Sequence, residues 1–441
     1  MVSRERTGPA DDAIGDGLGI ENLIILSRAD PIICGHSTET RNLADAAIGS
    51  GVARVHVVSY PLDVLEESEL PLKPRESVAA YGPGIEVDRP APVGDYKLLD
   101  GRLGYGISGH LVDLLVRLPG RTAVMNLYIV PHGQMVMQAV ETYRHLTGGK
   151  SPATIAEAVG SDITNVVGNA VATGRYGAAA IVLQNYLAHD LPVAVSHFTL
   201  ELIVAAGQRV DERLGTCFAK ELAERVRVSY PAIDTAAYLQ PALTESELTD
   251  RLARRGLARD GYVLFLSRLT KAKGVDDLIQ AYRASAVYGR LPLAICGTGP
   301  AESALRQIAG GDQSILFFND VGDLDKLALM AGCHAYCLPS KPQPEFTETF
   351  GIAVAEAMLS GGIGPVITTR TGGIPEATGD HCLYHRAGDV PDLTARLNEL
   401  AGMSTAARVA ISQRARDYCL RFDRATILAN LLGPACLRAA A

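Results

Sequence analysis

The feature that most constrains the fold of this chain is an alternation of short β-branched runs with longer helical patterns. ENLIILS (21–27) is followed by the helix-like TETRNLADAAIGSG and then by ARVHVVSYP (53–61). Further on, TAVMNLYIVPHG (122–133) precedes QMVMQAVETYRHLTGG, in which Gly148 and Gly149 end the helical pattern. Strands that alternate with helices in this way form a mainly parallel, doubly wound sheet.

The alternation occurs twice along the chain. ERVRVSYPAID (224–234) closes the first series, and the polar segment 240–261 that follows is predicted to break helical structure. The pattern then resumes with YVLFLSRL, PLAICGTGP, SILFFND, AYCLPS and GPVITTRTGG. Because 441 residues exceed one ordinary core, we predict more than one domain. The predicted parts are a flexible tail over 1–20, α/β domains over 21–235 and 236–415, and a C-terminal helix over 416–441 that packs back on the first domain.

Composition excludes several classes of protein. Hydrophobic residues make up 47% of the chain and charged residues 20%, which is typical of globular proteins. The net charge is −8 and the sequence has no basic block, so nucleic-acid binding is not expected. No apolar run reaches membrane-spanning length, and residues 1–20 lack the apolar core of a signal peptide. We expect a cytoplasmic protein without a membrane span, and homo-oligomer formation stays open.

The cysteines are scattered along the chain and form no CxxC pair. Cys333, His334 and Cys337 are close enough in sequence to invite a metal interpretation. However, AGCHAYCLPS has the pattern of a helix end that leads into a buried strand, and a fourth ligand is missing. We therefore predict no metal site and reduced thiols, as is usual in the cytoplasm.

Chemically reactive side chains follow several of the expected strands. In open α/β sheets, ligands bind beyond the carboxyl ends of the strands. Arg268 and Lys273 follow YVLFL at a predicted helix start, where two cations form an anion site, although a solvated basic loop has the same pattern. GTGP (297–300) and TGGIPEAT (371–378) provide glycine turns whose amides can approach a ligand, but a plain strand-to-helix turn needs none. His197, at the end of PVAVSH, is either structural or catalytic.

Two glutamates bracket the apolar stretch in EFTETFGIAVAEA (345–357). On one continuous helix, eight residues at about 100° each would leave Glu348 and Glu356 roughly 80° apart, on different faces. We therefore expect Glu348 in a loop, a helix that begins between Thr349 and Gly351, and Glu356 pointing inward from its second turn. This is the layout of a ligand site rather than of a surface ion pair.

Five segments of the second half resemble the nucleotide-sugar-binding domain of retaining glycosyltransferases of the GT-B fold, family 4. They are SRLTKAKGVDDLIQAY, AICGTGP, LPS, ETFGIAVAEAM and VITTRTGGIPEATGD, in the family's order and spacing. SYPAID (229–234) resembles the family's interdomain turn, although Tyr230 and Ala232 replace its first proline and its glycine. The first half is less similar and matches through the glycine loop at 34–37, TGRYGAAAI and VAVSH. The resemblance implies two Rossmann-like domains that face each other across a cleft.

The resemblance also implies roles for single residues in binding the donor. Glu348 is implied to face the donor sugar and Glu356 to hold the ribose hydroxyls, and a carboxylate accepts strong hydrogen bonds from such a diol. Glu345 is the alternative for the first role, because its loop is longer than usual in the family. Arg268 and Lys273 are implied to neutralise the diphosphate leaving group. The other expected donor contacts are Gly35, Gly297, Thr349, Phe350 and Gly351.

The implied activity is transfer of a sugar from a GDP- or UDP-sugar to a small acceptor, with retention of configuration and without a metal or other cofactor. His197 is expected beside the reacting carbon. The first domain is expected to supply the acceptor contacts, namely His36, His132, Arg175 and Tyr176. Only 8 of the 41 basic residues are lysine, and this arginine bias together with the divergent first domain is typical of specialised bacterial metabolism such as antibiotic assembly.

Two alternatives stay open at this point. A GT-B phosphorylase or a sugar-nucleotide hydrolase would use phosphate or water as the acceptor, but the chain has no recognisable cofactor-lysine pattern. A non-catalytic nucleotide-sugar-binding protein would share the scaffold. The joint presence of Arg268, Lys273, Glu348 and Glu356 argues against it.

Overall fold

The computed structural model describes residues 19–68, 70–74, 78–94, 99–239, 243–344, 346–362 and 364–439. Most of the expected N-terminal tail lies outside the described residues, as does Glu345, the alternative sugar-facing glutamate.

The first half of the chain forms a parallel sheet with strand order β3-β2-β1-β4-β5-β6-β7. The strands are β1 (Asn22–Leu26), β2 (Arg54–Val58), β3 (Ile85–Asp88), β4 (Thr122–Leu127), β5 (Ala153–Ala158), β6 (Leu191–Ala194) and β7 (Arg227–Val228). The central strand β1 lies between β2 and β4, with Asn22 opposite both Arg54 and Thr122. The strand order therefore reverses between β1 and β4.

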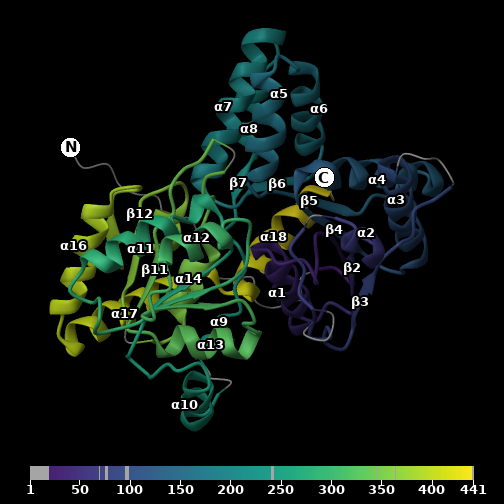
Figure 1. Cartoon of the computed structure of the whole chain (residues 1–441). Coiled ribbons are helices and arrows are strands. Elements are labelled where there is room, and N and C mark those ends of the chain that lie inside the picture. The colour runs from purple at the N-terminus through teal and green to yellow at the C-terminus, as the bar shows by residue number, and fades with distance from the viewer. Residues whose placement is uncertain are drawn as a thin grey trace, which may run out of the picture.

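The second half repeats this arrangement in a parallel sheet of order β10-β9-β8-β11-β12-β13. Its strands are β8 (Val263–Leu266), β9 (Leu293–Cys296), β10 (Ile315–Phe318), β11 (Ala335–Leu338), β12 (Val366–Thr369) and β13 (Leu383–His385). The strand order reverses between β8 and β11. The two sheets lie on opposite sides of the molecule (Figure 1), and each half has its own apolar core. The predicted architecture of two doubly wound α/β units is confirmed.

Helices cover both faces of each sheet (Figure 1). Those of the first half are α1 (Gly35–Gly49), α2 (Leu62–Glu66), α3 (Leu99–Arg117), α4 (Gln134–Thr147), α5 (Gly168–Ala172), α6 (Tyr176–Leu187), α7 (His197–Leu214) and α8 (Phe218–Arg225), with π-helical turns at Ile129–Gly133 and Asp162–Val167. Helices α5 to α8 project together from the sheet and share an apolar core. Those of the second half are α9 (Thr235–Leu239), α10 (Glu245–Ala253), α11 (Val275–Ala284), α12 (Glu302–Ala309), α13 (Asp323–Gly332), α14 (Ile352–Leu359), α15 (Ile374–Thr378), α16 (Val390–Gly402) and α17 (Thr405–Cys419), with a 3₁₀ turn at Lys271–Lys273.

The prediction that segment 240–261 breaks helical structure is wrong, because α10 forms within it. Thr244 and Glu247 make a reciprocal capping box, in which the Thr244 side chain accepts from the Glu247 amide and the Glu247 carboxylate accepts from the Thr244 amide. Leu248 and Leu252 bury the inner face of the helix. The polar composition of the segment concealed this short amphipathic pattern.

The C-terminal helix α18 (Arg424–Ala439) returns to the first half after a 3₁₀ turn at Leu420–Phe422. It packs beside α1 and β5, and Leu428, Leu431 and Leu432 belong to the core of the first half (Figure 1). The chain thus crosses between the halves twice. The two crossings lie side by side, because the Ile233 amide donates to the Phe422 carbonyl and the Arg424 amide donates to the Ile233 carbonyl, both at 2.9 Å.

Candidate active site

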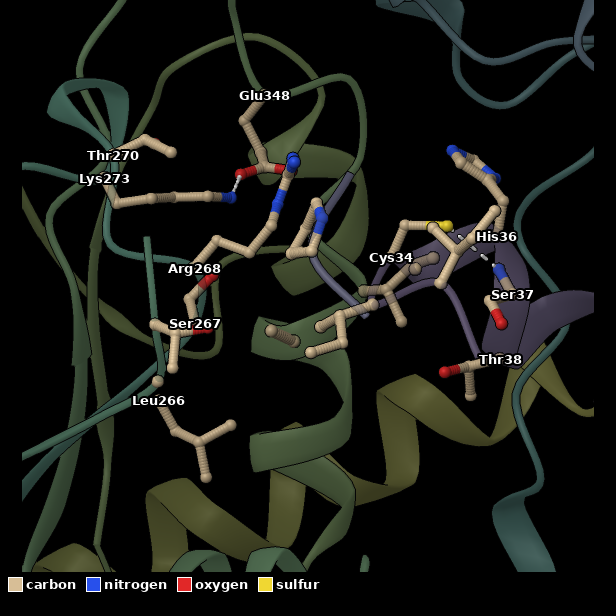
Figure 2. Close-up of a pocket in the computed structure, with 18 of the residues that line it drawn as sticks. Cys34, His36, Ser37, Thr38, Leu266, Ser267, Arg268, Thr270, Lys273 and Glu348 are labelled. Atoms are coloured by element: carbon tan, nitrogen blue, oxygen red, sulfur yellow. Dashed lines mark hydrogen bonds and ion pairs between the residues drawn. The ribbon is translucent and has the colours of Figure 1, made fainter. Parts of the chain in front are cut away.

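A cavity of about 1060 Å³ lies where the carboxyl ends of the two sheets face each other. Cys34 and His36 at the start of α1 form one wall, and Arg268, Lys273 and Glu348 form the opposite wall (Figure 2). Each wall lies at the point where the strand order of its own sheet reverses. Such switch points are where open α/β sheets bind ligands, so the cavity is the candidate active site.

The structure brings most of the sequence-predicted site residues into this cavity. The predicted residues that line it are Gly35, His36, Arg268, Lys273, Gly297, Glu348, Thr349, Phe350, Gly351 and Glu356. The lining does not include His132, Arg175, Tyr176 or His197.

The cationic wall follows β8. Lys273 ends a 3₁₀ turn, and its ammonium group forms an ion pair with the Glu348 carboxylate (Figure 2). The two side chains are only 7% and 13% exposed, respectively, so water screens this pair much less than a surface pair. Arg268 is exposed, and within the described part of the chain it has no ion-pair partner. The predicted cation pair therefore consists of one buried, paired lysine and one available guanidinium.

The loop that carries Glu348 is fixed from behind by the TGG turn. The Gly373 amide donates to the Glu348 carbonyl at 2.9 Å. A Cβ on Gly373 would lie 2.0 Å from the Thr349 carbonyl oxygen, so only glycine permits this close approach. Gly373 does not line the cavity, and its amide is bonded to the Glu348 carbonyl, so the turn positions the Glu348 loop.

Glu356 points inward from the second turn of α14, as predicted. The helix begins at Ile352, and Gly351 is its N-cap with φ of 102°. The Glu356 carboxylate accepts a hydrogen bond from Lys326 on α13 at 2.7 Å. Tyr238 contacts the same carboxylate, and burial followed by this negative charge raises the pKa of Tyr238 well above its usual value. Sequence analysis missed Lys326 and Tyr238, since neither lies in a recognisable motif.

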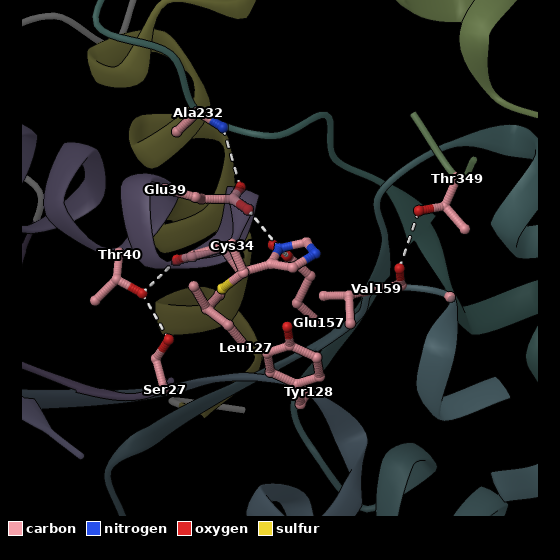
Figure 3. Close-up of polar contacts among 12 residues, drawn as sticks. Ser27, Cys34, Glu39, Thr40, Leu127, Tyr128, Glu157, Val159, Ala232 and Thr349 are labelled. Atoms are coloured by element: carbon pink, nitrogen blue, oxygen red, sulfur yellow. Dashed lines mark hydrogen bonds and ion pairs between the residues drawn. The ribbon is translucent and has the colours of Figure 1, made fainter. Parts of the chain in front are cut away.

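A group of carboxylates that sequence analysis also missed lies behind the first-half wall, next to His36. His36 Nδ1 is 3.0 Å from Glu39 Oε2, and the other oxygen of Glu39 accepts from the Ala232 amide at 3.0 Å (Figure 3). Behind them, burial and the Glu39 charge raise the pKa of Glu157 well above its usual range. Burial also raises the pKa of Asp162, although the hydrogen bonds that Asp162 accepts from the Ile129 and Gly160 amides act to lower it.

His197, which is expected beside the reacting carbon, does not line the cavity in this structure, and its role stays a prediction. Ser196 caps α7 by accepting from the Thr199 amide at 3.0 Å, so His197 is the first residue of the helix and its side chain is exposed. Its own amide donates to Glu376 Oε2 at 2.8 Å. Glu376 belongs to α15 in the second half, so the start of α7 joins the two halves.

Of the four expected acceptor contacts, only His36 lines the cavity. His132 is fully buried, bonds Tyr60 through Nε2 at 2.9 Å, and has a pKa that burial lowers to about 3, which makes it a neutral structural residue. Arg175 is exposed just before α6, and Tyr176 packs against the core of the α5–α8 group. All three follow strands or begin helices, but only tertiary packing decides which way their side chains point.

Cys333, His334 and Cys337 do not form one of the candidate metal-ligand groups found among the described residues. Both thiols are buried, and His334 Nδ1 bonds Asp260 Oδ1 at 2.7 Å instead. Two other groups among the described residues could hold a cation, since their ligand atoms lie within 4.8 Å of one another; they are His36, Glu39, Glu157 and His56, Glu86, Asp88. The first group borders the cavity, so metal independence stays a prediction.

The two halves touch directly beside Glu348. Thr349 Oγ1 donates to the Val159 carbonyl at 3.0 Å (Figure 3), and Gly160 lies against the Thr349 side chain. Gly160 has φ of +101°, and a Cβ there would lie 2.0 Å from Thr349 Cγ2. This glycine permits the close approach of the two walls.

Replacing Gly160 by alanine is therefore expected to destabilise the protein by about 1–3 kcal/mol, because the new methyl group adds steric overlap to an unfavourable φ. Thermal unfolding measures the loss. The double variant Gly160→Ala with Thr349→Ser lacks the Thr349 Cγ2 atom and should regain part of the lost stability. An alanine variant as stable as the natural protein would contradict the close contact between the halves.

Comparison with known proteins identifies the class of fold. Residues 260–402 match the family model described as Glycosyl transferases group 1. Solved GT-B glycosyltransferases superpose over nearly the whole chain, which confirms the expected GT-B fold. HepE from Anabaena, in complex with UDP and glucose, has a TM-score of 0.65 and 17% identity, with 92% of this chain and 97% of that chain covered. WaaG, a glycosyltransferase involved in lipopolysaccharide biosynthesis, has a TM-score of 0.61 and 16% identity, with 93% and 98% covered.

A curated relative matches part of the chain. O-antigen chain mannosyltransferase B of Escherichia coli is 30% identical over 152 residues, which are 33% of this chain and 38% of that protein. The match therefore spans well under half of the relative's length. None of the described helices has both the length and the apolar character that a membrane crossing requires.

Proposed function

We propose that the protein is a retaining glycosyltransferase that moves a sugar from a UDP- or GDP-linked donor to a small acceptor. One observation carries the proposal: Arg268, Lys273, Glu348 and Glu356 meet in one cavity at the switch point of the second sheet. Two cations, a buried carboxylate on a helix and a second carboxylate between them fit the charges and hydroxyls of a nucleotide sugar. The family match over 260–402 covers all four residues.

In this proposal the donor lies along the second wall. Its diphosphate occupies the space beside Arg268 and Lys273, with the free amides at the start of α14 adding positive potential. Glu356 accepts hydrogen bonds from the ribose hydroxyls, and Lys326 holds this carboxylate in place at 2.7 Å. Glu348 then faces the sugar, because its loop lies between the diphosphate-binding cations and the first-half wall.

The Lys273–Glu348 ion pair gives this arrangement a mechanism. A bound donor divides the pair, so that Lys273 turns to the phosphate oxygens and Glu348 to the sugar hydroxyls. The bond from the anomeric carbon to the phosphate oxygen breaks, a bond from the acceptor heteroatom to the same face of that carbon forms, and the leaving phosphate takes the acceptor proton. Lys273 and Arg268 stabilise the negative charge that develops on the diphosphate.

The first-half wall faces the reacting carbon and is the proposed acceptor side. His36 is the expected acceptor contact that lies there, held by Glu39. The composition of the chain supports a role in bacterial specialised metabolism such as antibiotic assembly. HepE was solved with UDP and glucose, and the curated relative is a mannosyltransferase. The experiment below therefore includes both uridine and guanosine nucleotides.

Calorimetric titration with UDP, GDP and ADP tests the proposal directly. We expect one uridine or guanosine diphosphate to bind with a Kd in the micromolar range, about −7 to −8 kcal/mol, and ADP to bind more weakly. The matching nucleotide sugar should then release its diphosphate only when an acceptor is present. Release with water alone would favour the hydrolase alternative, and release that requires inorganic phosphate would favour the phosphorylase. Binding of none of the three nucleotides would contradict the proposal.

Excess EDTA is expected to leave the transfer rate essentially unchanged, because Arg268, Lys273 and the α14 amides supply the positive charge that a metal supplies elsewhere. The rate of diphosphate release before and after chelation measures this. Loss of activity that magnesium or manganese restores would show that the reaction needs a metal, and would direct attention to the His36, Glu39 and Glu157 group.

A further inference from the structure

A second cationic position lies on the first-half wall, at the switch point of the first sheet. Arg28 follows β1 and Tyr128 follows β4, the two strands between which the order reverses. The Arg28 guanidinium carbon lies 4.5 Å from the centroid of the Tyr128 ring, and both residues line the cavity. A cation stacked on an aromatic ring keeps its N–H groups available at its edge.

Arg28 is one of three cavity cations, with Arg268 and the exposed Lys271, that have no ion-pair partner among the described residues. Three lysines that line the cavity have carboxylate partners; these pairs are Lys73 with Asp30, Lys273 with Glu348, and Lys326 with Glu356. Throughout the described ranges, Arg28 has the Tyr128 ring as its contact and no carboxylate within ion-pair distance. A half-buried guanidinium without a counter-ion is costly to keep, which points to an anionic ligand.

Arg28 and Arg268 approach the same space from opposite halves. Burial raises the pKa of the Cys34 thiol, and the charges of Arg268 and Arg28 both act against that increase. Arg28, Cys34 and Arg268 all line the cavity, so both guanidinium groups lie on the walls of the same space. If Arg268 and Lys273 neutralise the single diphosphate of the donor, Arg28 is left for a different anion on the acceptor side.

Tyr128 provides a fixed support for the Arg28 guanidinium. It is buried and has φ of 114°, an unusual value for a residue with a side chain. His36 and His132 pack edge-on against its ring at 5.3 and 5.9 Å between centroids. Backbone strain of this kind concentrates at ligand-binding positions. The ring thereby fixes where the guanidinium of Arg28 sits.

The carboxylates behind the first-half wall are not expected to repel an anion bound at Arg28. Glu39 is held by His36 and by the Ala232 amide. Burial raises the pKa of both Glu157 and Asp162, which favours their neutral forms. In addition, α1 begins beside the cavity and has no acidic residue in its first turn, so its dipole favours negative charge there.

We infer that Arg28 is the anion-binding residue of the acceptor subsite, and that the acceptor carries a carboxylate or phosphate group. The inference rests on the proposed function and adds the chemical class of the acceptor. Arg28 positions the acceptor by its charged group, so that the attacking heteroatom lies between His36 and the donor sugar.

The first experiment uses the two anionic groups themselves as probes. Inorganic phosphate and acetate are titrated, at constant ionic strength, into protein saturated with the nucleoside diphosphate that it binds, so that the cations of the second wall are occupied. We expect saturable binding of at least one anion to the natural protein and to the control variant Arg209→Gln, which removes an exposed charge from α7. Binding should be at least about 10-fold weaker in Arg28→Gln and partly restored in Arg28→Lys.

The second experiment compares glucose, glucuronate and glucose 6-phosphate as acceptors, with diphosphate release from the nucleotide sugar as the readout. The charged members are expected to be better acceptors, and Arg28→Gln should lower kcat/KM for them by about 10²-fold while it leaves nucleoside diphosphate affinity unchanged. Equal anion binding in Arg28→Gln, no saturable binding of either anion, or a preference for neutral glucose would overturn the inference. Loss of nucleotide binding in every variant would instead overturn the proposed function.

Discussion

Replacing Lys273 by alanine is expected to lower turnover by about 10²-fold or more, because the variant loses a cation that is proposed to stabilise charge on the leaving diphosphate. The same variant is also expected to lose stability, because it breaks an ion pair. Lys273 is the ion-pair partner of Glu348, and both side chains are largely buried. Removing it leaves a buried carboxylate without its counter-ion, which also costs stability. Steady-state rates with the full donor, together with thermal unfolding, measure the two effects.

Two further variants separate catalysis from stability. Arg268→Ala removes an exposed guanidinium that has no ion pair in the described part of the chain, so it should lower turnover without lowering the melting temperature. Lys220→Ala removes an exposed charge from α8 and should change neither. Near-native turnover of Lys273→Ala or of Arg268→Ala in a folded protein would show that the diphosphate lies elsewhere.

The two glutamates are expected to respond differently to the same change. Glu356→Gln should weaken binding of the free nucleoside diphosphate and of the intact donor, since this residue is proposed to hold the ribose. Glu348→Gln should leave binding of the free diphosphate nearly unchanged and lower turnover, because its contact matters most as the sugar approaches the transition state. Calorimetry with the free diphosphate and rates with the full donor distinguish the two results.

Lys326 provides a further test of the different roles proposed for Glu348 and Glu356. Its ammonium group holds Glu356 at 2.7 Å, so Lys326→Met should reproduce part of the affinity loss of Glu356→Gln and add little to it in the double variant. An equal loss of diphosphate affinity in Glu348→Gln and Glu356→Gln would remove the distinction between the loop glutamate and the helix glutamate.

Local pattern was enough to predict the parts of the site that lie within one short segment. Glu348 in a loop, Glu356 inside α14 and the cations after β8 follow from strand ends, helix periodicity and the spacing of charges. The alternation of strands and helices predicted both doubly wound units for a similar reason, since each element is determined by its own residues and those next to them.

The placement of the predicted residues that do not line the cavity has the opposite origin. His197 and His132 both follow strands, as a catalytic histidine at a sheet edge does, yet one begins a capped helix and the other is fully buried against Tyr60. Nothing within either segment decides between these outcomes. The direction of a side chain after a strand depends on what packs against it, and the partners come from distant parts of the chain.

The sequence by itself thus determined the two α/β units and the motif proposed to bind the donor, because strand periodicity, helix starts and short spacings are properties of neighbouring residues. Only the tertiary structure decided which residues gather on the first-half wall, the proposed acceptor side. Arg28 and Tyr128 are brought together by the order β2-β1-β4, and Lys326 reaches Glu356 from another helix. Which strands become neighbours depends on burying apolar faces across the whole domain, so the pairing of these charges and rings appears only when the sheets are assembled.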